Sequence, residues 1–258
     1  MSERLRINGL RKAFGGLAVT RDVSFGLQSG ERVALIGPNG AGKSTLINLV
    51  TGLLSADGGE VRLDGQDVTR ASATARVRAG LVRSFQISRL FQNMTVRQNL
   101  RLAVLQRQRL TARCWRPADQ YQAVEHETAS LLDQLGLSAI ADNLVHHIAY
   151  GQQRLTELAL ALALNPGVLL LDEPAAGIPQ SETGLILNAL ERLPAGIAIL
   201  MVEHDMDLVF RFASRVLVLA AGELIFEGTP DELVKDSRVR VAYLGGYRAG
   251  DSHRGRTA

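Results

Sequence analysis

The sequence is short of cysteine and of long hydrophobic runs, and each shortage excludes a class of protein. Cys114 is the only cysteine, so no disulfide can form within the chain, as is typical of a reducing compartment. The first residues lack the apolar core of a secretion signal. The most apolar stretches, residues 197–202 and 216–221, fall well short of the roughly 20 residues that cross a bilayer. We therefore expect a soluble, cytoplasmic chain, which is compatible with docking on a membrane protein.

The sequence also lacks a strong charge of either sign. Its 29 basic and 26 acidic residues leave a formal net charge of only +3, and no cluster of lysine and arginine with interleaved aromatic residues occurs. Such a distribution disfavours nucleic acid as a partner. With 258 residues, of which 46% are hydrophobic, the chain can bury a large core as one large domain or two small ones.

One motif indicates a phosphate-binding loop. Residues 37–44 fit the pattern G-x-x-x-x-G-K-[ST], between an apolar strand pattern at 32–36 and a helical pattern that opens at Ser44. In such a loop, backbone N–H groups surround the phosphates, Lys43 reaches the β- and γ-phosphates and Ser44 ligates Mg²⁺. A merely glycine-rich turn is the alternative, which the strand–loop–helix context disfavours. The predicted nucleotide-binding residues are Gly37, Pro38, Asn39, Gly40, Ala41, Gly42, Lys43, Ser44 and Thr45.

A second motif supplies two carboxylates. Residues 168–171 form a short apolar run after the break at 165–167, which is typical of a buried parallel strand, and Asp172 and Glu173 follow it directly. We assign Asp172 to the Mg²⁺ shell and Glu173 to the general base that polarises the attacking water. The alternative is that both carboxylates are merely exposed charges at a strand end, and the presence of the phosphate loop disfavours it. Together the two motifs predict binding and hydrolysis of a nucleoside triphosphate.

The pattern along the chain predicts an α/β fold. Residues 5–36 and a hairpin at 58–65 give a β-rich start, and residues 95–165 predict helices that open with a capping box at 95–98. After Pro166, strands and helices alternate as in a parallel sheet with covering helices. The predicted strands are 168–171, 197–202 and 215–219, the helices are 181–193 and 205–213, and a hairpin at 221–222 and a capped helix from Thr229 follow.

These patterns predict a P-loop NTPase core with a mainly parallel sheet, an N-terminal antiparallel β subdomain and an inserted helical subdomain. We expect one domain over 4–246, in which 4–86 and 167–246 form the core and 87–166 the helical insertion. Residues 247–258 are polar and basic and are expected to be disordered.

Three more segments stand in a characteristic order. Gln86 follows a short strand pattern, the segment 149–153 precedes a helix, and His204 ends the strand after Glu173. With the two phosphate motifs, this order resembles the ATP-binding subunits of ABC transporters over roughly residues 4–246. It is most similar to subunits that energise uptake of branched-chain amino acids and related amides. The similar segments are Phe14-Gly-Gly-Leu17, Ala149-Tyr-Gly-Gln-Gln153, Asp172-Glu-Pro-Ala-Ala-Gly177, Glu203-His-Asp-Met206 and Ala242-Tyr-Leu-Gly245.

The resemblance implies a role for each matching residue. Phe14 would stack on the adenine, although a core aromatic in a β-hairpin is an open alternative. Gln86 would contact Mg²⁺ and the attacking water and pass that contact to the helical insertion. His204 would hold the γ-phosphate and the water, unless it only bonds a neighbour at the strand end. The catalytic set is thus Glu173, His204 and Gln86, and the metal set is Ser44, Gln86 and Asp172.

The resemblance also implies partners. ATP and Mg²⁺ would be the cofactors, and two ATPase chains, identical or paralogous, would face each other head to tail. The signature segment Ala149, Tyr150, Gly151 and Gln152 would then bind the partner's nucleotide, chiefly through the Gly151 N–H. Transmembrane permease subunits would hold the chain on the inner face of the cell membrane, with an external substrate-binding protein as an indirect partner. Residues 87–100, with Arg89 and Phe91, would form the docking surface, or else a core-facing loop.

Two departures and three rival functions qualify this interpretation. The signature's usual serine is Ala149 and its usual first glycine is Tyr150, while Pro179 stands where an aspartate is usual. A lipopolysaccharide-type export ATPase and a soluble assembly ATPase remain alternatives. A DNA-repair or translation ATPase is disfavoured because neither a long coiled coil nor a tandem unit is present. The transported substrate is not encoded in a recognisable motif.

Overall fold

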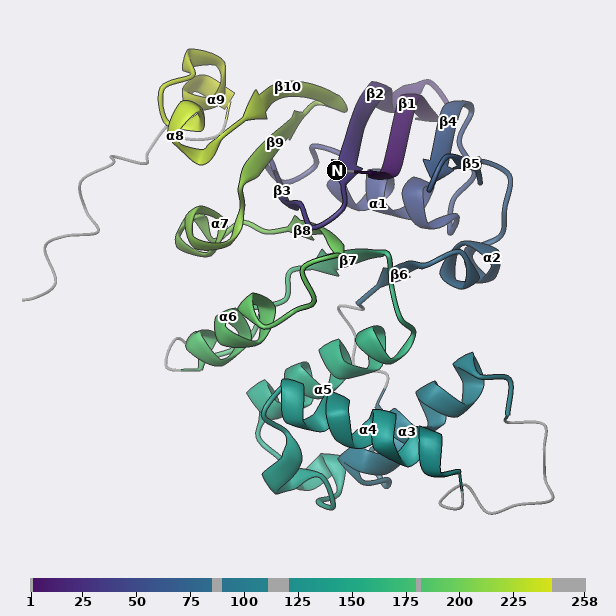
Figure 1. Cartoon of the computed structure of the whole chain (residues 1–258). Coiled ribbons are helices and arrows are strands. Elements are labelled where there is room, and N and C mark those ends of the chain that lie inside the picture. Colours follow the sequence, from purple (N-terminus) through teal and green to yellow (C-terminus); the bar gives the residue numbers. More distant parts are fainter. Residues whose placement is uncertain (1, 85–89, 111–120, 180–181, 243–258) are drawn as a thin grey trace, which may run out of the picture.

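The computed structural model describes residues 2–84, 90–110, 121–179 and 182–242, which form two β-sheets and a set of helices (Figure 1). The antiparallel sheet has the strand order β2-β1-β4-β5, and the second sheet has the order β10-β9-β3-β8-β7-β6. The antiparallel sheet comprises β1 (Glu3–Phe14), β2 (Leu17–Gln28), β4 (Gly58–Leu63) and β5 (Gln66–Asp67). The second comprises β3 (Arg32–Ile36), β6 (Leu81–Arg83), β7 (Val168–Asp172), β8 (Ala198–Val202), β9 (Arg215–Ala220) and β10 (Glu223–Gly228).

The helices surround the second sheet and extend away from it. They are α1 (Lys43–Thr51), α2 (Ala73–Arg78), α3 (Val96–Arg107), α4 (Gln122–Gln134), α5 (Tyr150–Ala163), α6 (Thr183–Glu191), α7 (Met206–Phe212), α8 (Pro230–Leu233) and α9 (Ser237–Ala242), with 3₁₀ turns η2 (Ser138–Ile140) and η3 (Val145–His147). Among the described helices, none combines the length and apolar character that crossing a bilayer would need.

The central strands are buried on both faces because their apolar residues alternate between two cores. In β7, Val168 and Leu170 pack with the core on the side of the antiparallel sheet, whereas Leu169 and Leu171 pack with the core on the helical side. Strands β3, β8, β7 and β6 pair in parallel, and β3 pairs in parallel with β9. The continuous apolar runs of the sequence are therefore explained by a sheet covered on both sides, and the predicted α/β class is confirmed.

Helix α1 links the two sheets through one apolar cluster. Leu46 and Leu49 of the helix pack with Leu5 and Ile7 of β1 and with Leu35 of β3. Figure 1 shows α1 directly beneath the antiparallel sheet. The helix that follows the phosphate loop is thus fixed on both sides.

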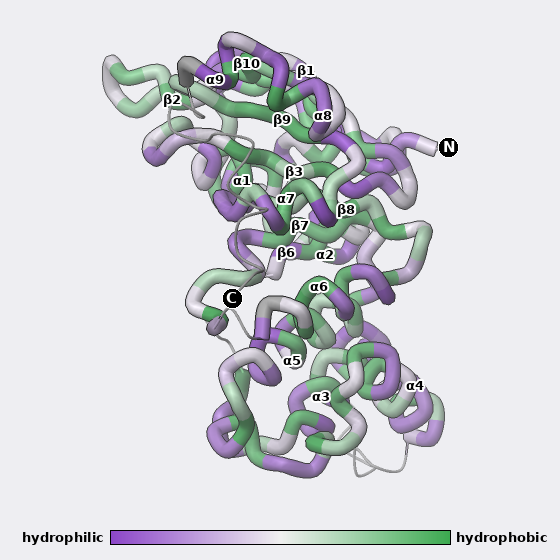
Figure 2. Tube along the Cα trace, turned by 90° about the vertical axis from the view of Figure 1, so that its left-hand side faces the viewer, coloured by the Kyte–Doolittle hydropathy of each residue, from purple (hydrophilic) through white to green (hydrophobic). Residues whose placement is uncertain are grey.

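Helices α3, α4 and α5 form the insertion between β6 and β7, at the end of the molecule away from the antiparallel sheet (Figure 1). The predicted capping box is present, because the Gln98 N–H donates to Thr95 Oγ1 at 3.1 Å and the Thr95 N–H donates to Gln98 Oε1 at 2.9 Å. Hydrophobic residues gather along the strands, while the helices of the insertion alternate between hydrophobic and hydrophilic positions (Figure 2). Many of their apolar residues join the helical-side core of the sheet, while Val104, Leu105, Val124 and Ala163 form a separate small cluster.

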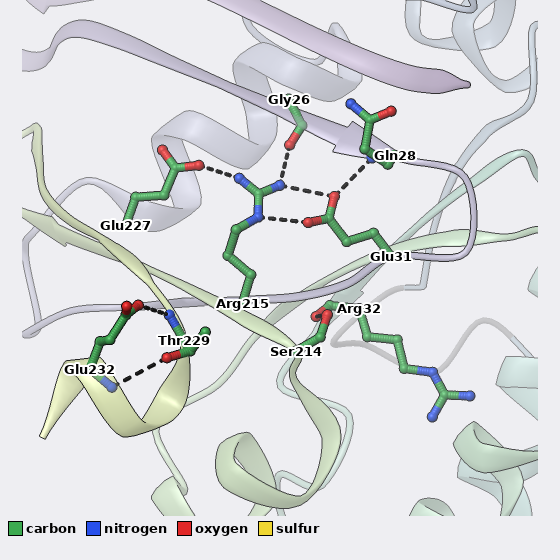
Figure 3. A network of polar contacts seen from close by, with 9 residues as sticks. All are labelled: Gly26, Gln28, Glu31, Arg32, Ser214, Arg215, Glu227, Thr229 and Glu232. Atoms are coloured by element: carbon green, nitrogen blue, oxygen red, sulfur yellow. Dashed lines mark hydrogen bonds and ion pairs between the residues drawn. The ribbon is translucent and has the colours of Figure 1, made fainter. Parts of the chain in front are cut away.

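A network around Arg215 ties the two sheets together at the start of β9 (Figure 3). Its guanidinium donates to Glu31 Oε1 at 2.7 Å and Oε2 at 2.9 Å, and to Gly26 O of β2 at 2.5 Å, and it pairs with Glu227 of β10. The Gln28 N–H donates to the same Glu31 carboxylate at 2.8 Å. The planar guanidinium, with five donors, suits a junction where three strands meet. In the same view, Thr229 and Glu232 form the second predicted capping box.

Arg76 is a buried cation that closes the C-terminal end of α1. Its side chain is 3% exposed and donates to Leu49 O at 2.7 Å, Val50 O at 2.6 Å, Thr69 O at 2.8 Å and Ala71 O at 3.2 Å. Burial lowers the pKa of Arg76 from its usual value. The carbonyls at a helix C-terminus carry partial negative charge, so the guanidinium satisfies them and complements the helix dipole. Helix α2, which carries Arg76, was not predicted, because its only buried residue is this arginine.

Replacement of Arg76 by methionine should destabilise the fold. The buried carbonyls would lose their donor, and we expect the free energy of unfolding to fall by about 2–4 kcal/mol. Urea unfolding followed by circular dichroism measures this. Arg78→Met on the exposed face of the same helix is the matched control and should change stability by less than about 0.5 kcal/mol. An Arg76→Met variant as stable as the parent would show that the clamp contributes nothing.

Candidate functional site

The parallel pairing of β3, β8 and β7 brings three predicted segments to one edge of the sheet. The phosphate loop follows β3, the pair Asp172 and Glu173 ends β7, and His204 follows β8, which lies between the other two strands. The carboxyl ends of parallel strands meet at the same edge, where open α/β sheets bind their ligands. Segments that are up to 167 residues apart in sequence, from Gly37 to His204, therefore form one site.

The phosphate loop runs so close to neighbouring backbone that two of its glycines admit no side chain. A Cβ at Gly37 would lie 2.1 Å from Leu219 O, and a Cβ at Gly42, whose φ is 101°, would lie 2.7 Å from Val19 O. The loop is also anchored by the Gly222 N–H, which donates to Ala41 O at 3.0 Å. These contacts hold the loop between β2 and β9 and fix its shape before a ligand arrives.

Lys43 occupies the centre of this loop. Its Nζ donates to Gly37 O at 2.6 Å and to Pro38 O at 3.1 Å. Burial lowers the pKa of Lys43, while the nearby carboxylates of Glu173 and Asp172 raise it. The ammonium thus satisfies loop carbonyls and faces both acids, in a position that a phosphate group could share.

The start of α1 is suited to an anion. Gly42 precedes the helix in the left-handed conformation and has no side chain that could cap the first N–H groups. Ser44 is exposed in the first turn. A helix start with free amides and a positive dipole end favours phosphate.

Asp172 lies at the end of β7 and forms an ion pair with Arg83 of β6. Arg83 also donates to Asn48 Oδ1 of α1 at 2.8 Å, so it links the carboxylate to the phosphate helix. Among the described residues, no cluster of three or more histidine, cysteine or acidic side chains could hold a metal alone. One hydroxyl from Ser44 and one carboxylate from Asp172 instead fit Mg²⁺, which takes few protein ligands and completes its shell with water and substrate phosphates.

Glu173 and His204 face each other across the site. Glu173 Oε1 lies 3.7 Å from His204 Nδ1, and His204 is 66% exposed at its side chain. Glu173 has a φ of 47°, unusual for a residue with a Cβ, and its N–H donates to Val202 O at 2.9 Å. A strained backbone held by a neighbouring strand is found where a side chain must be aimed. Both groups reach solvent, so a substrate could contact them.

The segment 149–152 opens α5 beside the loop that follows Glu173. The Gly151 N–H donates to Glu182 Oε2 at 3.2 Å, and the Tyr150 hydroxyl donates to Ala176 O at 3.5 Å. The Ala149 N–H donates to Gln152 Oε1 at 3.1 Å, but alanine has no oxygen to return the contact. The Glu182 carboxylate of this chain therefore accepts from the Gly151 N–H, which we predicted to donate to a phosphate of the nucleotide bound by the partner chain.

Three further predicted residues have different outcomes. Phe14 is 50% exposed at the tip of the β1–β2 hairpin, with Lys12 Nζ 5.7 Å from its ring centre. A core position for Phe14 is therefore wrong. Gln86 and Arg89 lie outside the described residues, so their predicted contacts remain predictions.

Three residues near the site were not assigned a role from the sequence. Arg83 and Glu182 were not singled out from the sequence, and Glu203 appeared only as part of a similar segment. An acid directly after the fully apolar strand β8 was the available signal for Glu203. The contacts of Arg83 and Glu182 join distant segments and have no local sequence signature.

Comparison with known families matches two parts of the chain. Residues 20–176 match the family model described as ABC transporter. Residues 223–249 match the one described as branched-chain amino acid ATP-binding cassette transporter.

Individual relatives cover nearly the whole chain. It is 38% identical over 250 residues to the high-affinity branched-chain amino acid transport ATP-binding protein LivG of Escherichia coli, covering 93% of this chain and 97% of LivG. It is 34% identical over 243 residues to the lipopolysaccharide export system ATP-binding protein LptB of E. coli, with the same coverage. Among solved structures, the ADP conformation of MJ1267, an ATP-binding cassette of an ABC transporter, superposes with a TM-score of 0.82 at 32% identity, covering 95% of this chain and all of that one.

Lys43→Ala should abolish nucleotide binding or hydrolysis, because the loop amides alone do not offset the charge of the β- and γ-phosphates. Binding of a fluorescent ATP analogue and release of inorganic phosphate measure the two steps. Lys235→Ala, an exposed lysine near α8, is the control and should keep parental values. Full phosphate release by purified Lys43→Ala would contradict the assignment of the loop.

Proposed function

Because the chain belongs to the ABC transporter ATP-binding subunits, which hydrolyse ATP, we propose that it powers uptake of branched-chain amino acids or related small amides through a membrane permease. The match of residues 223–249 to the branched-chain amino acid family carries this proposal. The similarity to LivG over 93% of the chain supports it. Since ABC ATPases share one core, the assignment of the substrate rests on these likenesses and not on the phosphate site.

Lipopolysaccharide-type export is the second candidate, because LptB is 34% identical over 243 residues. A soluble assembly ATPase is the third, and it would work without a permease. Copurification with hydrophobic subunits separates transport from assembly. Measuring which substrate stimulates ATP hydrolysis distinguishes uptake from export.

In the proposed cycle, ATP first binds at the phosphate loop. The first amides of α1 and the loop N–H groups surround the phosphates, and the Lys43 ammonium exchanges Gly37 O and Pro38 O for phosphate oxygens. Ser44 and Asp172 would hold Mg²⁺, which neutralises charge on the phosphates. Asp172 is paired with Arg83, so its carboxylate would have to share or leave that contact to hold the ion. The exposed ring of Phe14 would stack on the adenine.

Hydrolysis then needs a base and a group that holds the γ-phosphate. Glu173 accepts a proton from water as the water oxygen bonds to the γ-phosphorus and the bond from that phosphorus to the bridging oxygen of ADP breaks. His204 lies beside Glu173 and would contact the γ-phosphate, where it stabilises charge in the transition state. The products are ADP and inorganic phosphate.

A second ATPase chain would complete each site. Its signature amides would face the γ-phosphate bound by the first chain, so ATP closes the pair and cleavage reopens it. For the Gly151 N–H to take this role, the Glu182 carboxylate has to move aside.

The permease would dock near Phe91, which follows the segment of Gln86. The Phe91 ring is 59% exposed, and the Phe91 N–H donates to Oδ1 of the buried Asn99 at 2.8 Å. Asn99 Nδ2 returns a contact to Phe91 O at 3.2 Å. An exposed aromatic ring on a segment fixed by a buried amide suits an interface better than a core-facing loop.

The test is transport in vesicles that contain this chain and the permease subunits that copurify with it from native membranes. We expect ATP-dependent uptake of labelled leucine, isoleucine or valine when an external binding protein is supplied. Stimulation of hydrolysis by lipopolysaccharide, with no amino-acid uptake, would instead favour export.

Glu173→Gln should bind ATP without cleaving it, because the amide keeps the shape of the side chain but cannot take the proton. The closed pair should accumulate, so size-exclusion chromatography with ATP should show a dimer for this variant only. The pairing partner is a second copy or a paralogous ATPase chain.

The matched control is Glu191→Gln at the exposed end of α6, which should behave as the parent. Hydrolysis by Glu173→Gln at the parental rate would remove Glu173 from catalysis. If the variant is inactive but stays monomeric with every candidate partner, Glu173 remains the proposed base and the proposal of a site shared between two chains is wrong.

Phe91→Ala should weaken binding to the permease and lower transport by about tenfold, since loss of an anchoring aromatic at an interface costs on the order of 1–2 kcal/mol. The affinity of the isolated chain for ATP should not change. Leu185→Ala, an exposed leucine on α6, is the control. Normal assembly and transport by Phe91→Ala would place the docking surface elsewhere.

A further inference from the structure

Glu203 is a buried acid at the edge of the site, and no step described above uses it. Its side chain is 2% exposed. In the sequence, Glu203 stands directly after β8 and directly before His204. Within the described residues, it forms no ion pair with lysine or arginine, and the ionisable side chain beside it is the imidazole of His204, whose Nδ1 lies 3.7 Å from Glu203 Oε2. A buried carboxylate without a strong cation is costly, and such a cost is common at functional sites.

Backbone amides hold this carboxylate instead of a cation. The His204 N–H donates to Oε2 at 3.0 Å and the Asp205 N–H donates to the same oxygen at 3.4 Å. The Ala175 N–H donates to the other oxygen, Oε1, at 3.4 Å. Burial raises the pKa of Glu203, and these three amides oppose the rise. Both oxygens are therefore used as acceptors, one toward each of two loops.

The two loops are the ones that carry the proposed base and its neighbour. Ala175 lies two residues after Glu173, and the same loop continues to Ala176, whose carbonyl contacts Tyr150 of α5. His204 and Asp205 begin the loop that leads into α7, where Asp205 caps the helix. The Glu173 N–H also bonds Val202 O, the carbonyl just before Glu203. One side chain thus fixes the spacing between the loop of Glu173 and the loop of His204.

We propose that Glu203 is a positioning residue for hydrolysis, which holds Glu173 and His204 in register across the γ-phosphate. This inference rests on the proposed roles of those two residues. Glu203 touches neither ATP nor water in this scheme, and it acts through the backbone of both loops. Loss of its double contact lets the loops move independently, and a misplacement of about 1 Å between reacting groups can slow a reaction by about a hundredfold.

Glu203→Gln tests the double contact with minimal change of shape. Glutamine has one acceptor oxygen, so it can serve either Ala175 or the pair His204 and Asp205, while its NH₂ group faces the remaining donor. The matched control is Glu232→Gln in α8, where a carboxylate also accepts a backbone N–H, at 2.8 Å from Thr229, but lies outside the site.

The measurements are kcat for phosphate release, Kd for ATP and the midpoint of thermal unfolding. We expect Glu203→Gln to lower kcat by about tenfold or more, with Kd within about twofold of the parent and an unfolding midpoint no lower than that of Glu232→Gln. Parental kcat in Glu203→Gln would overturn the proposal. A fall in kcat that tracks an equal loss of ATP binding or of folded protein would also overturn it. If Glu203→Gln does not fold, Glu203→Asp replaces it under the same criteria, since its shorter side chain cannot reach both loops.

A double-variant cycle with His204→Ala gives the second readout. If Glu203 acts by placing His204 and Glu173, then Glu203→Gln should lower kcat less in the His204→Ala background than in the parent. If Glu203→Gln lowers kcat by the same factor in the parent and in His204→Ala, the proposal is overturned. Parental rates in His204→Ala and Glu173→Gln would overturn the proposed catalytic roles and this inference together. Impaired rates in those two variants with a parental rate in Glu203→Gln would overturn this inference alone.

Discussion

The site depends on one constraint, the parallel pairing of β8 with β3 on one side and β7 on the other. Each of these strands ends in a segment with a different chemical character. A loop of amides follows β3, a pair of carboxylates ends β7 and a histidine follows β8. Parallel pairing in register places the three ends together through backbone hydrogen bonds, whatever contacts their side chains then make. The apolar alternation that buries both faces of the sheet therefore also determines which polar residues meet.

Buried and partly buried charged side chains connect the elements around this sheet. Arg215 joins β9 to β2 and β10, Arg76 closes the end of α1, and Glu203 bonds two loops at the edge of the sheet. Arg76 and Glu203 bind backbone groups rather than an oppositely charged lysine, arginine or carboxylate. Backbone groups cannot be exchanged by substitution, so these contacts constrain main-chain positions more directly than ion pairs between side chains do.

The sequence was sufficient for the fold class and for most central elements, because these depend on local periodicity and spacing. The apolar run before Asp172 predicted β7 and the box at Thr95 predicted the start of α3. Helix α2 was missed because an arginine, and not an apolar residue, is its buried side chain. The exposure of Phe14 could not be read from its residue type, since an aromatic in a hairpin packs inward or outward depending on distant strands. The bond between Gly151 and Glu182 joins segments 31 residues apart, and no local pattern encodes it.

That bond bears on the energetics of pairing. In the single chain the Gly151 amide is already satisfied by a carboxylate, whereas a bare glycine amide at a helix start would be solvated or unsatisfied. When two chains pair as proposed, a phosphate oxygen would replace the Glu182 carboxylate as the acceptor of the Gly151 N–H. In the proposed pairing, this amide would therefore contribute only the difference between two similar contacts to the free energy of closure. A small net gain at this amide would favour reopening after each cleavage, because Glu182 can take the donor back when the phosphate leaves.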